Sequence, residues 1–193
     1  GGTAQILASI TAGMNTTSGT GTTQGSWATD DSIVFGTGRN GIQRVSAAGG
    51  NPQQLTTLNL KDGEDFHTSP EILPGGKALI YGANIGTTQR RLMIRTLSSG
   101  DTRVLEAEGM MPHYVSSGHL VFGRSGSLFA APFDLQRLQL TAPPVSVLDG
   151  VATDVNRAGS SVVHAAIAGN GSLAFLPSDD VVNTRTLVWV DRQ

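Results

Sequence analysis

The stretch of the sequence best suited to chemistry places a histidine just after two carboxylates. His67 follows Glu64, Asp65 and Phe66. An imidazole beside carboxylates can exchange protons as an acid–base pair, and the same groups can bind a metal ion. Asp62 adds a further oxygen for a calcium ion, but the spacing does not match an EF-hand loop. The simpler interpretation is a solvated acidic loop.

The other histidines lie far apart in the chain. His113, His119 and His164 follow His67 at spacings that are not typical of metal ligands. They could form one site only if the fold brought separate segments together, and a histidine held by its neighbours is the commoner case. We therefore predict no metal site and no cofactor. The candidate ligand-binding residues are Asp65, His67, His113 and His164.

Familiar catalytic motifs are missing from the sequence. Gly36–Gly41 matches the G-x-G-x-x-G pattern of dinucleotide-binding loops, which requires a helix directly afterwards. Residues 42–45 instead alternate like a strand, so we expect a hairpin loop. The chain has no G-x-S-x-G nucleophile elbow, no H-E-x-x-H zinc motif and no P-loop. On this basis the chain is expected not to be an enzyme.

The composition excludes several classes of protein. The 193 residues include 13 Lys and Arg against 15 Asp and Glu, a net charge of -2, so no basic face is available to bind nucleic acid. The absence of cysteine excludes disulfides, thiolate metal sites and thiol nucleophiles. No apolar run approaches the ~20 residues that span a bilayer. We expect no nucleic-acid partner and no membrane insertion by this segment.

Four short apolar runs repeat along the chain, each after a turn signal and each ending in an aromatic residue. The final aromatic residues are 46, 41 and 53 residues apart. Each run is followed by a second strand-like segment, and the first three units add a third. The runs are residues 32–35, 78–81, 119–122 and 172–175. The segments that follow are 42–45, 92–97, 128–133 and 187–190, then 53–55, 102–105 and 145–148.

A period of about 40 to 50 residues with about four strands per unit is typical of β-propeller blades. A single blade cannot bury its own faces, but blades stacked around an axis can. We predict an all-β fold, a β-propeller fragment of about four blades with up to four antiparallel strands each. Trp27 and Trp189 would pack between blades. The expected repeats are an outer strand and loop over 1–24, then 25–66, 67–108, 109–158 and an incomplete 159–193.

Both ends of the chain read as cut from something longer. Gly1–Leu7 resembles the outer strand of a blade, and the last unit stops after its third strand. An incomplete ring exposes apolar blade faces and unpaired strand edges. Two outcomes stay open: the first segment closes the last blade, or copies of the chain self-associate through their incomplete blades.

Several segments carry a resemblance to a known family. Residues 25–35 (GSWATDDSIVF), 45–50 (VSAAGG) and 69–77 (SPEILPGGK) together resemble TolB-like propeller repeats, which are related to WD repeats. The similarity is closest to the propellers attached to bacterial serine/threonine kinases. It is strengthened by residues 118–122 (GHLVF), 131–134 (APFD) and 187–193 (LVWVDRQ).

The resemblance implies a ring of six or more blades in the parent protein, outside the cytoplasmic membrane, that acts as a sensor or interaction platform. It implies no catalytic residues for this chain. We therefore expect a non-catalytic module that binds a protein, a peptide or a small ligand. The alternative is a propeller hydrolase or lyase, or the propeller domain of a serine peptidase, with a site at the channel end formed by His67, His113 and His164.

Overall fold

The structure, a computed structural model, describes Leu7, residues 24–86, 88–155, 161–168, 171–178 and 188–190. These residues are mostly in β-strands, with two 3-10 turns, η1 (Gly38–Asn40) and η2 (Leu60–Asp62), and no α-helix among them. Within the described part of the chain, no helix is long and apolar enough to span a membrane.

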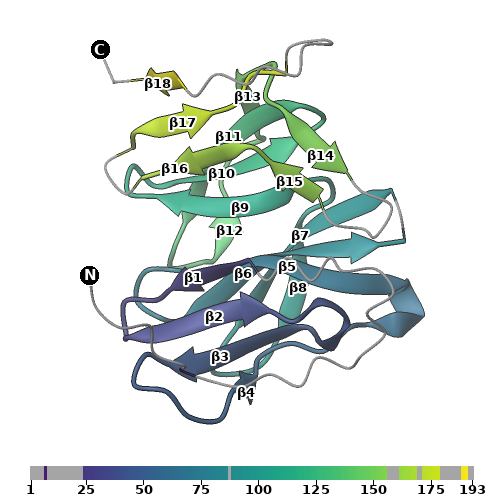
Figure 1. The fold of residues 1–193 in the computed structure, drawn as a ribbon, viewed down its shortest axis with the longest axis vertical. Coiled ribbons are helices and arrows are strands. Elements are labelled where there is room, and N and C mark those ends of the chain that lie inside the picture. The colour runs from purple at the N-terminus through teal and green to yellow at the C-terminus, as the bar shows by residue number, and fades with distance from the viewer. Residues whose placement is uncertain are drawn as a thin grey trace.

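The strands form separate antiparallel sheets stacked along the molecule (Figure 1). Blade 1 has the order β1–β2–β3–β4, and blade 2 has the order β5–β6–β7–β8. The strands of blade 1 are β1 (Gly25–Trp27), β2 (Ser32–Gly36), β3 (Ile42–Ser46) and β4 (Gln53–Gln54). Those of blade 2 are β5 (Glu64–Ile72), β6 (Ala78–Ile85), β7 (Gln89–Thr96) and β8 (Thr102–Glu106).

Blade 3 has the order β9–β10–β11, with β12 and β13 both paired to β11, and blade 4 has the order β16–β17–β18. A two-stranded pair, β14 with β15, lies between them in the sequence. Blade 3 contains β9 (Met110–Val115), β10 (His119–Arg124), β11 (Ser127–Asp134), β12 (Gln139–Leu140) and β13 (Val145–Leu148). The remaining strands are β14 (Thr153–Val155), β15 (Ser161–Val163), β16 (Ala165–Ile167), β17 (Leu173–Phe175) and β18 (Val188–Val190).

The predicted all-β architecture of about four blades is confirmed. Each aromatic-ended run is the second strand of its blade, as β2, β6, β10 and β17, and the later predicted segments follow it in order. The innermost strands β1, β5, β9 and β16 were not predicted as elements. Strand β5 runs across the repeat boundary expected at residues 66 and 67.

Apolar side chains hold neighbouring blades together in three clusters. Between blades 1 and 2, Val34 and Ile42 pack with Leu79 and Tyr81. The second cluster joins blades 2 and 3 around Ile80, Leu92, Leu120 and Phe122. The third places Leu128 of blade 3 with Val151 and Val163. Because each face is buried only by the next blade, the stacking itself forms the core.

The predicted packing of the two tryptophans between blades can be checked at Trp27. Ile72 in β5 and Tyr114 in β9 occupy equivalent positions of their strands, because each pairs with the second residue of an aromatic-ended run. Ile72 packs into the first cluster and Tyr114 into the second. The matching residue of blade 1, Trp27, is 65% exposed, so the prediction that it packs between blades is wrong. The side chain of Trp189 lies outside the described residues.

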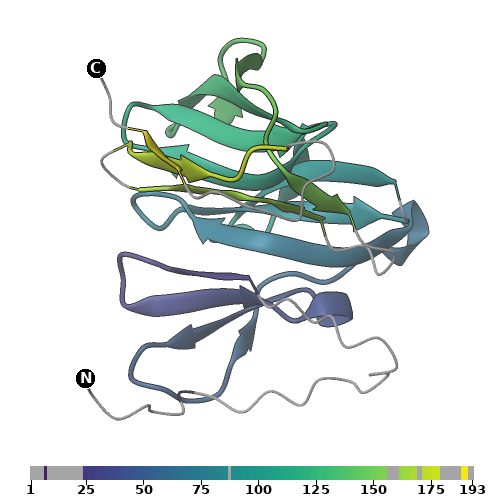
Figure 2. The same cartoon turned by 45° about the horizontal axis from the view of Figure 1, so that its top comes forward.

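Ring closure by the first segment falls mostly outside the described residues. Leu7 is the described residue of that segment, and its carbonyl accepts a hydrogen bond from the Gly50 amide at 3.1 Å. Gly50 lies in the turn between β3 and β4, and Figure 1 places blade 1 and β18 at opposite ends of the view, while in Figure 2 blade 1 (purple) lies below the yellow C-terminal strands. Leu7 therefore lies beside blade 1, and self-association stays a prediction.

Candidate functional site

The inner strands of blades 2 and 3 share the same distortion. Ser69 in β5 and Met111 in β9 both have a left-handed backbone, with φ of 48° and 51°. Each precedes a proline, Pro70 or Pro112, and the strand pairing shifts its register at the same place in both blades. Bulges of this kind redirect the side chains that follow them. Backbone strain is common at binding sites, so this repeated feature marks a candidate site.

The bulges bring a glutamate and a histidine from adjacent blades into contact. Nδ1 of His113 lies 2.6 Å from Oε2 of Glu71. The Tyr114 backbone amide donates a hydrogen bond to the other carboxylate oxygen, Oε1, at 3.1 Å. Both oxygens of Glu71 are therefore engaged, and the carboxylate fixes the orientation of the imidazole ring.

The far nitrogen of the same ring is unpaired. Nε2 of His113 is buried and has no hydrogen-bond partner among the described residues. The hydrogen bond to Glu71 raises the pKa of His113, although burial opposes the shift. The protonated ring thus presents a charged N–H donor at Nε2, whereas the neutral ring would present a lone pair there.

His113 lines a cavity of about 380 Å³ between the inner strands of all four blades. Each inner strand contributes one lining residue at the same register position, where it pairs with the third residue of an aromatic-ended run. These four residues are Ser26, Glu71, His113 and Ala166. We call this space the axial cavity. Its walls are Gln24–Ser26, Ser69–Glu71, Met111–His113, Val121–Gly123, Leu128, Val163 and Ala165–Ile167.

The other polar groups of the cavity wall are largely paired with one another. The Ser26 hydroxyl donates to the Pro70 carbonyl at 2.8 Å, and the Ser69 hydroxyl donates to the side-chain oxygen of Gln24. The Gln24 amide nitrogen contacts the Met111 sulfur at 3.9 Å, a weak acceptor. The two serine bonds join blade 1 to blade 2 around the cavity, and the Gln24 contact reaches blade 3.

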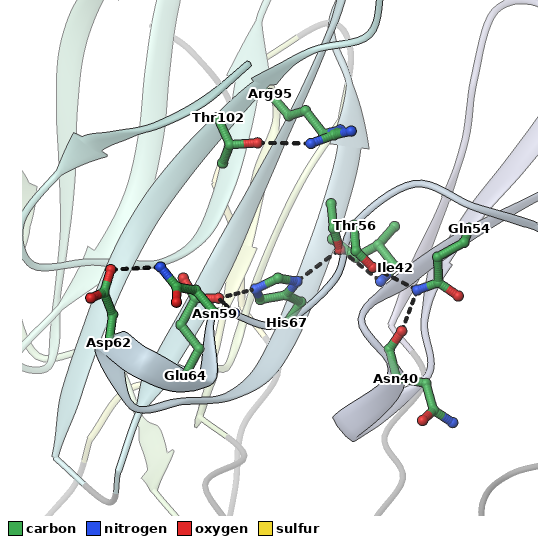
Figure 3. A network of polar contacts seen from close by, with 10 residues as sticks. All are labelled: Asn40, Ile42, Gln54, Thr56, Asn59, Asp62, Glu64, His67, Arg95 and Thr102. Carbon is green, nitrogen blue, oxygen red and sulfur yellow. Dashed lines mark hydrogen bonds and ion pairs between the residues drawn. The ribbon is translucent and has the colours of Figure 1, made fainter. Parts of the chain in front are cut away.

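His67 lies in a different place, inside a buried network (Figure 3). It is 1% exposed in β5, and its Nε2 lies 3.0 Å from Oε2 of Glu64. Its Nδ1 lies 2.7 Å from the Thr56 hydroxyl, which accepts a hydrogen bond from the Ile42 amide at 2.9 Å. Burial lowers the pKa of His67, so the neutral ring donates from Nε2 to Glu64 and accepts from Thr56 at Nδ1.

This network resembles a carboxylate–histidine–hydroxyl triad, but its role is structural. Glu64 and Thr56 are also buried, and Thr56 already binds the backbone of β3. The Asn59 amide donates to Glu64 at 2.6 Å, which satisfies the carboxylate further. The network therefore links blade 1 to blade 2. The interpretation of this stretch as a solvated acidic loop is wrong for Glu64.

The sequence-predicted site residues do not come together. Asp65 is half-buried in β5, outside the residues that line the axial cavity. His164 follows β15, and its Nε2 lies 2.7 Å from Oδ2 of Asp154, also outside the cavity. Of the four candidates, only His113 faces the cavity. Among the described residues, no group of three or more histidines and carboxylates is placed to hold a metal ion.

The Gly36–Gly41 motif forms the hairpin loop that the sequence predicted. Strand β2 ends at Gly36, η1 fills the loop, and β3 begins at Ile42. Gly41 has φ of 79°, and a Cβ atom there would lie 2.2 Å from the Thr56 carbonyl oxygen. This glycine therefore permits the close approach of β3 to the network around His67.

Sequence reasoning missed Glu71, the partner of His113. The signal was the repeated order of Ser69-Pro70-Glu71 and Met111-Pro112-His113 in neighbouring units. Matching the prolines would have matched Glu71 with His113, one blade apart. Without the innermost strands as elements, the sequence offered no reason to align these two segments.

Comparisons with solved structures show the fold. The calcium-binding protein regucalcin from Agrobacterium tumefaciens matches with a TM-score of 0.55 and 14% identity, over 81% of this chain and 54% of that one. An oligogalacturonate lyase in complex with manganese matches with 0.54 and 15%, over 86% and 46%. A puromycin-hydrolyzing peptidase from Mycobacterium tuberculosis matches with 0.53 and 15%, over 87% and 36%.

These neighbours have propeller-type folds, so the chain is an all-β propeller that spans about half of them or less. No protein-family model and no curated protein matches the chain. The expectation that the chain is not an enzyme is overturned, because two of these neighbours are enzymes on the same fold. At this identity the likeness shows the fold alone, and missing motifs do not exclude catalysis on it.

Proposed function

We propose that the chain is a ligand-binding propeller module whose binding site is the axial cavity. The observation that supports this most strongly is the buried, unpaired Nε2 of His113 on a ring that lines the cavity. Buried polar atoms are almost always hydrogen-bonded, so an exception at a cavity wall favours a partner supplied by a ligand.

Two further features support the proposal. A volume of about 380 Å³ lies within the range of small-molecule sites, which mix apolar walls with a few placed polar groups. The strained residues Ser69 and Met111 both lie on the cavity wall, where they set the positions of Glu71 and His113. A rigid pair on the inner strands of two blades is well suited to recognising one ligand orientation.

The likeness to TolB-like repeats gives this module a setting. In this proposal, the module is the sensor part of a larger bacterial protein and lies outside the cytoplasmic membrane. The small-ligand site would then report the presence of a compound to the rest of that protein.

A cavity-filling variant tests the proposal. Ala166 and Ala168 are both exposed, but only Ala166, on β16, is among the residues that line the cavity. We expect saturation-transfer NMR with a library of small metabolites to detect compounds that bind the wild type and Ala168→Trp but lose most of their signal with Ala166→Trp. Equal signals from both variants, or no compound that binds the wild type, would contradict the proposal.

A further inference from the structure

The hydrogen-bonding groups of the axial cavity are unbalanced toward donors. Both oxygens of Glu71 already accept hydrogen bonds, from His113 and Tyr114. The hydroxyls of Ser26 and Ser69 each donate to a protein oxygen. Two nitrogens of wall residues lack an oxygen acceptor among the described residues: Nε2 of His113, which solvent does not reach, and the side-chain amide of Gln24, whose contact is a sulfur. A ligand that fits this wall supplies acceptor oxygens.

The two titratable groups of the wall are placed so that an acceptor at Nε2 would lie nearer the imidazole than the carboxylate. Glu71 and His113 are the titratable groups among the residues that line the cavity. Glu71 holds the ring at Nδ1, on the side opposite Nε2, and raises the pKa of His113. When the ring is protonated, its charge lies between the Glu71 carboxylate and an acceptor at Nε2. Hydrogen bonds between charged groups contribute about twice as much as neutral ones, so Nε2–H favours a carboxylate over a neutral carbonyl.

The rest of the wall is apolar. Val121, Leu128 and Val163 line the cavity together with the Ala165–Ile167 strand. Leu128 and Val163 also belong to the cluster that joins blade 3 to the following segments, so this side is fixed by packing. An apolar body placed there would be removed from water, while a charged or sugar-like body would lose its hydration without compensation.

We infer that the ligand of the axial cavity is a small carboxylic acid with an apolar body, whose carboxylate accepts a hydrogen bond from Nε2 of His113 once a small shift of the cavity wall uncovers that nitrogen. This inference rests on the proposed function and specifies its ligand class. The apolar body contacts the side of the cavity formed by Val121, Leu128 and Val163. The Gln24 amide is the second donor on the wall.

An isosteric pair of probes tests the assignment: 4-methylpentanoate and 4-methylpentanamide, titrated calorimetrically at about pH 6 and about pH 8.5. The acid is ionised at both values, since carboxyl pKa values lie near 4, so a pH effect arises from the protein. We expect the acid to bind at least about tenfold tighter than the amide at the lower pH, and to weaken as His113 loses its proton. The amide should bind with little dependence on pH.

Two variants assign the effect to one histidine. His113→Gln should remove most of the preference for the acid and its pH dependence, while His119→Gln, on β10 outside the cavity wall, should keep both. Circular dichroism melts of both variants check that they remain folded.

The possible outcomes separate the two proposals. Equal binding of acid and amide, abolished by Ala166→Trp, would overturn the carboxylate assignment and leave the cavity as a binding site. Binding of neither probe would also overturn it, and the metabolite screen then decides the proposed function on its own. Tighter binding of acetyl-alanyl-alanine than of the free acid would assign the carboxylate to a peptide end and overturn the small-acid assignment.

Discussion

Gly41→Ala should lower the free energy of unfolding by about 3 kcal/mol. Two costs add at this residue. An alanine is strained by about 1 to 2 kcal/mol at a left-handed backbone, here at φ of 79°. Its Cβ would also lie 2.2 Å from the Thr56 carbonyl oxygen, so the backbone of one segment must move. That movement would weaken the bonds from Thr56 to Ile42 and His67.

A second glycine separates these two costs. Gly118 has φ of 82°, close to that of Gly41, but no atom lies within 4 Å of a Cβ built on it. Gly118→Ala should therefore cost only the backbone strain, about 1 kcal/mol. Urea unfolding of both variants measures the difference. Equal losses would contradict the claim that close contact with Thr56 holds Gly41 in place.

His67→Leu should also destabilise the protein strongly, by about 3 kcal/mol near neutral pH. The substitution removes the donor to Oε2 of Glu64 and the ring nitrogen that contacts Thr56. Both partners are buried, so they lose a hydrogen bond without regaining water. His119→Leu, on the half-buried strand β10, should cost less than about 1 kcal/mol in the same urea titrations. Unchanged or increased stability of His67→Leu would contradict the structural role of the network.

The same residue predicts a dependence on pH. The pKa of His67 in the folded protein is lowered from 6.5 by burial, so below that pH the unfolded state binds more protons than the folded state. Its contribution to stability is fully present above about pH 6.5 and is lost as pH falls through the lowered pKa. The raised pKa of His113 contributes in the opposite direction, but His113 is present in both the wild type and His67→Leu, so its contribution does not affect the comparison. Wild type should therefore lose more stability than His67→Leu between about pH 7 and about pH 5.

The sequence predicted the blades because their middle strands carry a local signal. The runs that end at Phe35, Tyr81, Phe122 and Phe175 are apolar, follow turns and recur at a nearly constant spacing. These properties follow from burial on both faces between neighbouring blades. The inner strands β5 and β9 contain Pro70 and Pro112, while β1 and β16 are only three residues long, so neither alternation nor β-propensity marks these strands.

The site was harder to predict for the same reason. His113 was a candidate, but its partner Glu71 is 42 residues away in the sequence and on another blade. Their contact depends on the angle between two stacked sheets and on two bulges, which no short pattern encodes. His67 looked equally chemical in the sequence, yet its carboxylate neighbour lies three residues away and both are buried. Exposure to the cavity, rather than residue type, separates the two histidines.

Whether His113 holds the ligand can be measured in the imidazole nitrogen NMR spectrum of His113 during titration with 4-methylpentanoate. We expect the signals of Nε2 and its proton to shift on binding while Nδ1 stays bonded to Glu71, and saturation with the acid to raise the pKa of His113 further. Binding without a change at Nε2, or a fall in that pKa, would show that His113 does not hold the ligand.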